Sequence, residues 1–347
     1  MTQNEPQSRV PTVSAGYLFS LFENIVALGI TAKEITDKFP ELGQEPEFPS
    51  QRYPANLLLL LLHYAEDVLE TESIGLKVGA GLKPTQSVDV LYATTVCKTL
   101  GDSIALNLKY QPLIQEIGRT RLHIEGSTAR LVWHIGQQNA DWVKPVTDAV
   151  MTGYSSIGRW LVWADAPPII QAHFRYSAPK DLGDHERIFG PSMSFDAQRD
   201  ELVFPASLLD TPLPGHNPEL LRRLTARLDV LLGQLHEPGG LVREIKSILT
   251  SQIGINPIHI GTIANHLNMN ERTLRRRLDA ENTSFREISI STRKTLAETF
   301  LMDPAMSLSE VAQNVGFSDQ TAFSRAFKDW FGQSPKAYRE NLNSPSA

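Results

Sequence analysis

The stretch GFSDQTAFSRAFKDWFGQSP, residues 316–335, decides how the C-terminal part of the chain folds. Its apolar residues recur at i, i+3, i+4 and i+7, which predicts the buried face of a helix: Phe323, Ala326, Phe327 and Trp330. Its polar residues repeat the same spacing on another face: Thr321, Ser324, Arg325 and Lys328. Short polar side chains with two cations are suited to base edges and phosphates, so this face is a candidate DNA contact.

The residues just before this stretch predict a partner helix. Ser307 and Glu310 have the spacing of a capping box, and a short apolar stripe follows them. Gly316 stops that helix, and Ser318 or Asp319 caps the next one. Two short helices joined by a tight turn predict a helix-turn-helix motif over about residues 307–331.

An earlier segment, about residues 260–280, repeats this organisation. Asn270 is a good N-cap, and Leu274 and Leu278 form the inner face of the helix that it starts. The arginines of that helix share one outward face: Arg272, Arg275 and Arg276. An isolated arginine cluster is more often a solvated face, but arginine can also bridge guanine O6 and N7 with two hydrogen bonds.

A continuous helical stretch, Phe285–Met302, joins the two motifs. Roughly 17 residues at about 1.5 Å each span about 26 Å. With the turns at its ends, such a linker holds two recognition helices about 34 Å apart, one turn of DNA. Core packing alone does not readily produce two such motifs in phase, so the pair favours a DNA-binding function.

Composition limits the remaining possibilities. The chain has 347 residues, enough for two domains, and its net charge of −6 is unevenly spread, with −8 in the first 240 residues and +2 in the rest. Its one cysteine, Cys97, excludes an internal disulfide and a cysteine-based zinc site. The polar N-terminus carries no signal core, and the most apolar run, Leu57–Leu62, is too short to span a bilayer. We expect a cytoplasmic protein with a buried helix at that run and no membrane contact.

The N-terminal body is predicted to be α+β, with helices followed by a small antiparallel sheet. Helical spacing extends from Val13 to about Tyr110, interrupted by glycines at 75, 79 and 81. Residues 120–135 alternate as a hairpin does, and residues 193–205 predict a second hairpin. A helix over Asp141–Trp163 lies between these segments, and a strand is predicted near residues 169–177.

The predicted domains are a flexible tail at 1–10, a ligand-sensing and dimerisation domain at 11–235, a linker at 236–244 and a DNA-binding domain at 245–347. The linker is placed where HEPGG follows a long helix. That helix carries an a/d stripe of leucines: Leu221, Leu224, Leu228, Leu231 and Leu235. The stripe predicts either a dimer seam or a helix packed on its own domain.

No nucleophile elbow, HExxH sequence, paired glycine loop or Cys/His cluster is present, so we expect no catalytic residue, metal or cofactor. A lone strand histidine is usually structural. With aromatic and basic neighbours, however, two of them form a candidate pocket for a carboxylate ligand. Its predicted residues are Trp133, His134, Trp142, His173, Arg175 and Tyr176.

The C-terminal residues, including Gly316-Phe317, Arg325-Ala326-Phe327 and Ser334-Pro335, resemble the AraC/XylS family of bacterial transcription regulators. The family's two recognition helices enter successive major-groove segments. The resemblance implies base contacts from Arg272, Arg275, Arg276, Gln320, Thr321, Ser324 and Arg325, and phosphate contacts from Asn270, Thr273 and Lys328. Two departures, His259 at the usual Ser or Thr cap and Gly261 inside the helix, concern only the start of the first motif.

The body resembles the arabinose-binding-like sensor domain of regulators of the ornithine-utilisation type, on the stretch HERIFGPSMSFDAQRDELVFPASLLDTPLP. The AraC/XylS resemblance implies a transcription activator that binds promoter DNA and RNA polymerase, and the leucine stripe, read as a dimer seam, predicts that it is a homodimer. The sensor-domain resemblance also implies a small-molecule effector, an amino-acid catabolite or a fatty-acid-like molecule. The alternative is an enzyme or metabolite-storage domain that the C-terminal domain tethers to DNA.

Overall fold

The structure is a computed structural model that describes residues 11–43, 51–82, 89–136, 139–162, 169–235, 240–254, 259–267 and 269–343. The predicted tail at 1–10 and residues 236–239 of the predicted linker lie outside these ranges. Contacts divide the chain into two compact units, Met1–Pro218 and Glu219–Ala347.

The first unit begins with helices, as its apolar spacing predicted. Its helices are α1 (Ala15–Ala27), α2 (Ala32–Lys38), η1 (Pro40–Leu42), α3 (Ala55–Leu69), α4 (Ile74–Ala80), α5 (Asp89–Thr95), α6 (Leu100–Ile114), α7 (Ala140–Val162), α8 (Gly183–Phe189) and η2 (Ala206–Asp210). The leucine run lies in α3 and is buried except for Leu60, which is 44% exposed. Leu60 therefore departs from the predicted buried run, because six consecutive residues cover every side of a helix.

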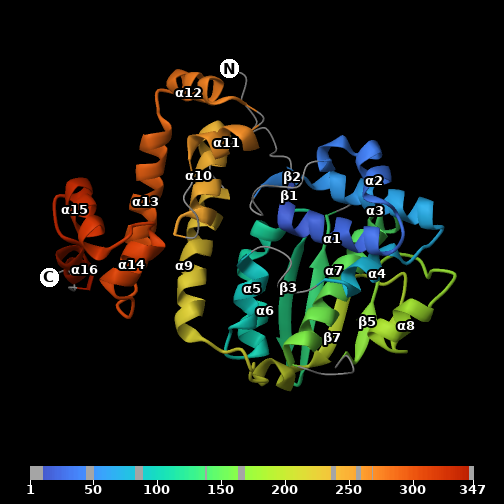
Figure 1. Cartoon of the computed structure of the whole chain (residues 1–347). Coiled ribbons are helices and arrows are strands. Elements are labelled where there is room, and N and C mark those ends of the chain that lie inside the picture. Colours follow the sequence, from blue (N-terminus) through green and yellow to red (C-terminus); the bar gives the residue numbers. More distant parts are fainter. Residues whose placement is uncertain are drawn as a thin grey trace, which may run out of the picture. The chain divides into compact units, whose positions relative to one another are not determined.

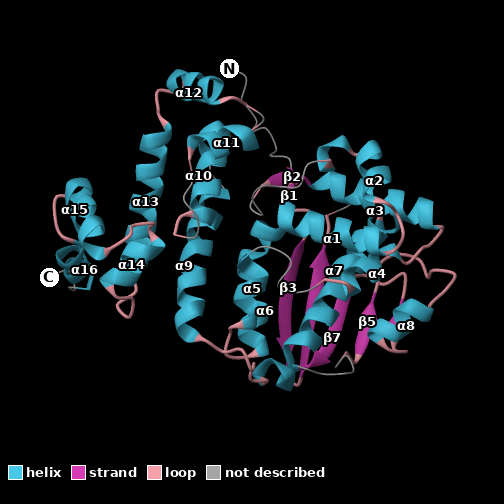
Figure 2. Ribbon diagram, in the orientation of Figure 1, coloured by secondary structure: helices cyan, strands magenta, loops and turns pink. Residues whose placement is uncertain are grey.

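The strands form two sheets, in which all neighbouring strands but one pair are antiparallel. Their bounds are β1 (Thr12–Ser14), β2 (Arg52–Pro54), β3 (Arg119–Glu125), β4 (Thr128–His134), β5 (Gln171–His173), β6 (Met193–Ser194) and β7 (Asp200–Pro205). β1 pairs with β2, and the other strands form a sheet in the order β3-β4-β7-β5-β6. Figure 2 shows this sheet with α7 in front of it. The α+β fold class and the β3–β4 hairpin are confirmed.

The second predicted hairpin, over residues 193–205, is wrong. β6 and β7 do not pair with each other, because β5 lies between them. β5 pairs antiparallel with β7 and parallel with β6, so the sheet is antiparallel except at this edge. The local alternation indicated two strands correctly, but their pairing depends on a strand that is distant in sequence.

Glycines 75 and 79 do not break a helix as expected; they lie inside α4, where it crosses α7. A Cβ atom at Gly79 would lie 2.6 Å from the carbonyl oxygen of Ala149 and 2.9 Å from Cβ of Thr152. Only glycine permits so close an approach of the two helices. These positions fix α7 against the helical layer, and α7 contributes many buried residues to the core of the first unit.

The second unit is helical in all its described parts. Its helices are α9 (Pro218–Leu235), α10 (Leu241–Gln252), α11 (Ile260–His266), α12 (Glu271–Ala280), α13 (Phe285–Leu301), α14 (Leu308–Asn314), α15 (Gln320–Phe331) and α16 (Pro335–Asn343). Figure 1 shows α13 with α12 at one end and α14 and α15 at the other. α13 packs on α10 and on α14.

The boundary between the two units lies at Pro218–Glu219, so α9 belongs to the second unit. The predicted boundary, at the linker after this helix, is therefore too late in the chain. Its buried Arg227 donates hydrogen bonds to the carbonyl oxygens of Ser251 (3.1 Å) and Ile253 (2.6 Å) at the C-terminal end of α10. Arg222 forms an ion pair at 2.8 Å with Asp303, a residue just after the end of α13. These contacts join α9 to the helix-turn-helix region.

The predicted leucine stripe of α9 is covered unevenly. Leu228, Leu231 and Leu235 are buried by the chain itself, with 1%, 9% and 8% of their surface exposed. Leu221 and Leu224 are half-buried. Packing within the chain accounts for the first three residues, and the dimer seam remains a prediction.

Candidate DNA-binding surface and sensor core

The first helix-turn-helix consists of α11 and α12. The side-chain oxygen of Asn270 accepts a hydrogen bond from the backbone N–H of Thr273 at 2.8 Å, so Asn270 is the N-cap of α12. Leu274 and Leu278 are buried beneath it. α11 begins at Ile260, and His259 makes no side-chain capping bond there. Its start is thus weakly capped, as the departure from the family pattern indicated.

The outward face of α12 is strongly basic. Arg272, Arg275 and Arg276 are all exposed, as the helical spacing predicted. Arg275 forms an ion pair with Glu271, one turn earlier, at 3.3 Å. This pair is more than half exposed on both sides, so solvent screens it and Arg275 can exchange Glu271 for another acceptor.

The second helix-turn-helix consists of α14 and α15. Ser307 and Glu310 form the predicted capping box at the start of α14, with a 2.8 Å bond from the Ser307 N–H to the Glu310 carboxylate. Asp319 caps α15 and accepts from the N–H of Ala322 at 2.8 Å. That bond to Ala322 lowers the pKa of the Asp319 carboxyl below its usual value. Gly316, at φ +85°, makes the turn between the two helices.

The inner face of α15 orients the outer one. Phe323 and Phe327 are fully buried, with ring centroids 5.6 Å apart, and Phe327 also packs 4.4 Å from Phe331. Trp330 is half-buried and packs on Phe317 at 5.8 Å, so it borders this core. The outer face then presents the predicted contacts: Gln320, Thr321, Arg325 and Lys328, which are exposed, and Ser324, which is half-buried.

The first unit contains a cavity of about 130 Å³ between α5, α6, α7 and strands β4 and β7. Most of the side chains around it are apolar, among them Leu91, Ile104 and Leu202. None of the six predicted pocket residues lines it. The sequence missed this cavity because its walls come from elements far apart in the chain; the apolar alternation of β4 and β7 was the only local signal.

The six predicted pocket residues lie in separate environments. Trp133 is buried, whereas its neighbour His134 is exposed, because successive strand residues point to opposite faces. Trp142 is 49% exposed and stacks on His63, with ring centroids 4.0 Å apart. His173 lies within 2.6 Å of the Ser194 hydroxyl. The structure therefore does not bring these residues together in one pocket.

The remaining two, Arg175 and Tyr176, bind buried carboxylates. Arg175 forms an ion pair with Asp200 at 2.7 Å. Tyr176 donates a hydrogen bond to Asp148 and lies 3.0 Å from Nε2 of His185. Burial first, and then the charge of Asp148, raise the pKa of Tyr176 well above its usual value.

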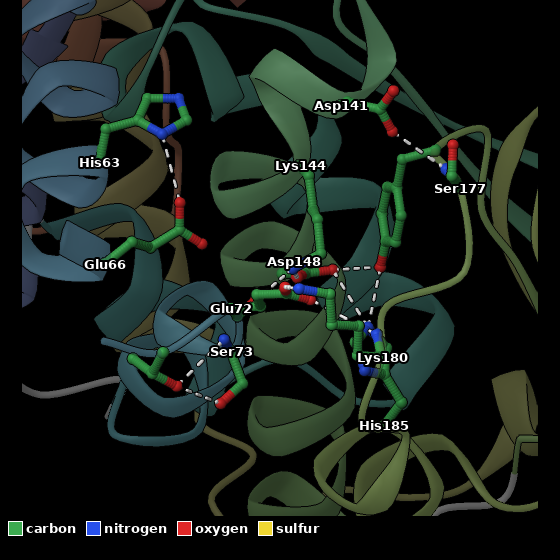
Figure 3. Close-up of polar contacts among 12 residues, drawn as sticks. His63, Glu66, Glu72, Ser73, Asp141, Lys144, Asp148, Ser177, Lys180 and His185 are labelled. Atoms are coloured by element: carbon green, nitrogen blue, oxygen red, sulfur yellow. Dashed lines mark hydrogen bonds and ion pairs between the residues drawn. The ribbon is translucent and has the colours of Figure 1, made fainter. Parts of the chain in front are cut away.

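Asp148 is the centre of a buried polar cluster that sequence reasoning missed (Figure 3). Its side chain is fully buried and forms an ion pair with Lys144 at 3.0 Å. Burial alone raises the pKa of Asp148, yet the hydrogen bond with His185 and the charge of Lys144 lower it below its usual value. The i, i+4 spacing of lysine and aspartate was visible in the sequence, but such pairs usually lie on solvated faces.

Among the residues that the structure describes, no cluster of three or more His, Cys, Asp or Glu side chains has the arrangement of a metal site. No helix in the described ranges is long and apolar enough to cross a membrane. Cys97 is buried, and burial raises the pKa of its thiol to about 11, so it behaves as a small apolar residue.

Two family models match the chain, one for each unit. Residues 43–213 match the arabinose-binding domain of AraC transcription regulators, and residues 263–341 match a helix-turn-helix domain. The chain is 24% identical to the ornithine utilization regulator of Pseudomonas aeruginosa, over 94% of this chain and 96% of that protein. It is 32% identical to an uncharacterized HTH-type transcriptional regulator of Mycobacterium tuberculosis, over 42% of each chain.

Among solved structures, the transcriptional regulator CdpR of Pseudomonas aeruginosa aligns with 94% of this chain and 98% of its own, at 20% identity and a TM-score of 0.46. The paired motifs at the ends of α13, the sensor domain before them and the two family matches agree. The chain belongs to the AraC family of transcription regulators, with an arabinose-binding-type sensor domain followed by an AraC-type DNA-binding domain.

Proposed function

We propose that this regulator is a ligand-responsive transcription activator whose subunit reads two successive major-groove segments. One observation carries the proposal. Two capped helices, α12 and α15, lie at the two ends of α13, and each has a buried apolar face beneath an exposed polar or basic one. A rigid helix between two recognition helices favours simultaneous reading over independent binding.

Within this proposal the two helices recognise different chemistry. Arg272, Arg275 and Arg276 on α12 suit guanines, since arginine offers two parallel donors to O6 and N7. Thr321, Ser324 and Arg325 on α15, with Gln320 beside them, offer shorter groups and one cation, which suits mixed sequences.

The phosphate contacts flank these faces. We propose that Asn270, Thr273 and Lys328 fix the register of the duplex. The carboxamide oxygen of Asn270 already caps α12, so only its N–H₂ group is available to donate to a phosphate. Thr273 is half-buried and Lys328 is exposed.

The sensor half of the proposal is that a small molecule bound in the first unit changes DNA binding by the second. An apolar cavity in an arabinose-binding-type domain supports it. We further propose a homodimer that uses α9 through the half-buried Leu221 and Leu224, and contact with RNA polymerase at the promoter.

Selection of bound sequences from a random DNA library tests the reading of bases. Arg276→Ala and Arg325→Ala should each cost about 1–3 kcal/mol of specific binding and relax the preference at a different base, about one helical turn apart. Arg121→Ala, an exposed arginine of β3 in the sensor unit, is the matched control. An unchanged consensus in both variants would refute the assignment.

The enzyme or storage alternative requires turnover or stoichiometric retention of a metabolite. It gains no support from the relatives, which are named as transcription regulators. Incubating the full chain with a metabolite extract and following substrate loss by mass spectrometry would detect it. Turnover that survives removal of DNA binding by Arg276→Ala with Arg325→Ala would favour that alternative.

A further inference from the structure

The cavity in the first unit is suited to one chemical class of ligand. It lies among α5, α6, α7, β4 and β7, elements that Figure 1 places together in the sensor unit. Arg159, on α7, is the single charged side chain among the described residues around it. Arg159 forms no ion pair with another described residue, and it is half-buried.

Most polar side chains around the cavity are already hydrogen-bonded to the protein. Gln111 donates to the hydroxyl of Thr120 at 3.0 Å and accepts from its backbone N–H at 2.9 Å. Tyr154 donates to Asn107 at 3.1 Å and lies 3.0 Å from the same Thr120 hydroxyl. Burial raises the pKa of Tyr154 to about 12, so this phenol stays neutral.

Two more polar residues are similarly engaged. Gln115 bonds both the N–H of Gly118 (3.1 Å) and its carbonyl oxygen (3.4 Å). Thr94 donates to the carbonyl of Leu91 at 2.6 Å. In contrast, the buried hydroxyl of Ser155 has no hydrogen-bond partner among the described residues, although it lies at the cavity. Ser155 and Arg159, one turn apart on α7, therefore offer polar groups at this cavity that no other described residue engages.

This arrangement disfavours sugars and diamino acids. A pentose carries several hydroxyl groups, and each that is buried without a partner loses its hydrogen bonds to water. The ammonium groups of ornithine would meet no carboxylate here and would be repelled by Arg159. The arabinose-binding family and the ornithine utilization regulator of Pseudomonas are named after such molecules, but the mostly apolar walls of this cavity disfavour them.

The size of the cavity limits the ligand further. At about 10–15 Å³ for each water-sized atom, a cavity of about 130 Å³ accommodates roughly ten non-hydrogen atoms. We propose that the cavity binds a monocarboxylate with an apolar body and about ten non-hydrogen atoms, such as octanoate, whose carboxylate meets Arg159. This inference rests on the proposed ligand response and specifies the chemistry of the effector.

Cavity filling provides the sharpest test. Gly158 lies at the cavity within α7, and a Cβ atom added there meets nothing within 4 Å. Gly158→Leu should therefore fold, since leucine also favours the helix more than glycine does. Gly233→Leu is the matched control, a helical glycine of α9 in the other unit that also has open space around an added Cβ.

Isothermal titration of the full chain should detect saturable binding of octanoate and none of L-arabinose or L-ornithine. Gly158→Leu should weaken octanoate by at least about tenfold, whereas Gly233→Leu should leave it unchanged. Arg159→Met should weaken octanoate by about tenfold and leave 1-octanol within about twofold. Circular dichroism confirms that each variant is folded.

Three results would overturn the inference: no octanoate binding, octanoate binding that Gly158→Leu does not weaken, or arabinose or ornithine binding that it abolishes. DNA affinity measured on the same samples separates the inference from the proposed function. Octanoate that binds as described without changing DNA affinity supports the inference and refutes the ligand response. A different compound that changes DNA affinity in Gly158→Leu as in wild type supports the ligand response and refutes the inference.

Discussion

Two lysine–aspartate pairs in this chain have the same spacing but differ in burial, and they predict very different costs for one substitution. Lys144 and Asp148 lie at i, i+4 in α7, 3.0 Å apart, with 13% and 0% of their side chains exposed. Lys33 and Asp37 lie at i, i+4 in α2, 2.6 Å apart, with 83% and 65% exposed. Asp148→Asn and Asp37→Asn remove the same charge from both.

The expected magnitudes follow from the surroundings. Asp148→Asn removes the ion-pair partner of the buried Lys144 ammonium, although the charge of Glu66 still interacts with that ammonium; losing the partner costs about 3–5 kcal/mol in comparable sites. Asparagine keeps an oxygen for the hydroxyl of Tyr176, so we expect the lower end, about 3 kcal/mol. Solvent screens the pair of Lys33, so Asp37→Asn should cost at most about 0.5 kcal/mol.

Thermal unfolding followed by circular dichroism measures both variants. For a domain of roughly 200 residues, 1 kcal/mol shifts the Tm by about 2–4 °C, so Asp148→Asn should lower the sensor transition by about 6–12 °C. Asp37→Asn should lower it by less than about 2 °C. Equal shifts in the two variants would refute the reasoning, because burial is the difference on which it depends.

Three further predictions concern pH, phosphate contacts and α9. The lowered pKa of Asp148 contributes stability that is present above its unfolded value near 3.8 and is lost as pH falls through the folded value; urea midpoints of wild type and Asp148→Asn should therefore converge in more acidic solution. Lys328→Ala should reduce the salt dependence of DNA binding by about 0.9 in log–log slope, measured by fluorescence anisotropy, with base preference unchanged. Arg227→Met should remove two charge-assisted hydrogen bonds, cost about 3 kcal/mol in the DNA-binding unit and speed hydrogen exchange at the end of α10; unchanged exchange would contradict its anchoring role.

The helix-turn-helix pair could be predicted because its signals are local. Caps at Asn270 and Ser307 lie within three residues of the groups that they bind. The apolar spacing of α15 directly indicates which face is buried, and the outward position of Arg325 follows from it. Nothing distant in the chain is needed to place these side chains, so the candidate DNA contacts lie on the predicted faces.

The sensor unit could be predicted less well because its decisive contacts are distant in sequence. The pairing of β6 depends on β5, which comes more than twenty residues earlier along the chain. The alternation of β4 places Trp133 and His134 on opposite faces of the sheet, but the sequence does not indicate which of the two faces is buried. The cavity requires walls from α1 to η2, and the burial of the Lys144–Asp148 pair depends on α8 and on Tyr176.

The central claim is that α13 holds two recognition helices so that they read one face of the duplex together. Inserting half a helical turn, about 5 base pairs, between the bases that Arg276 and Arg325 prefer rotates one segment away from its helix. The account predicts that wild-type affinity for this DNA, measured by anisotropy, falls about tenfold or more, to that of Arg325→Ala on the unaltered site. Affinity within about twofold of the unaltered site would contradict simultaneous reading by the two helices.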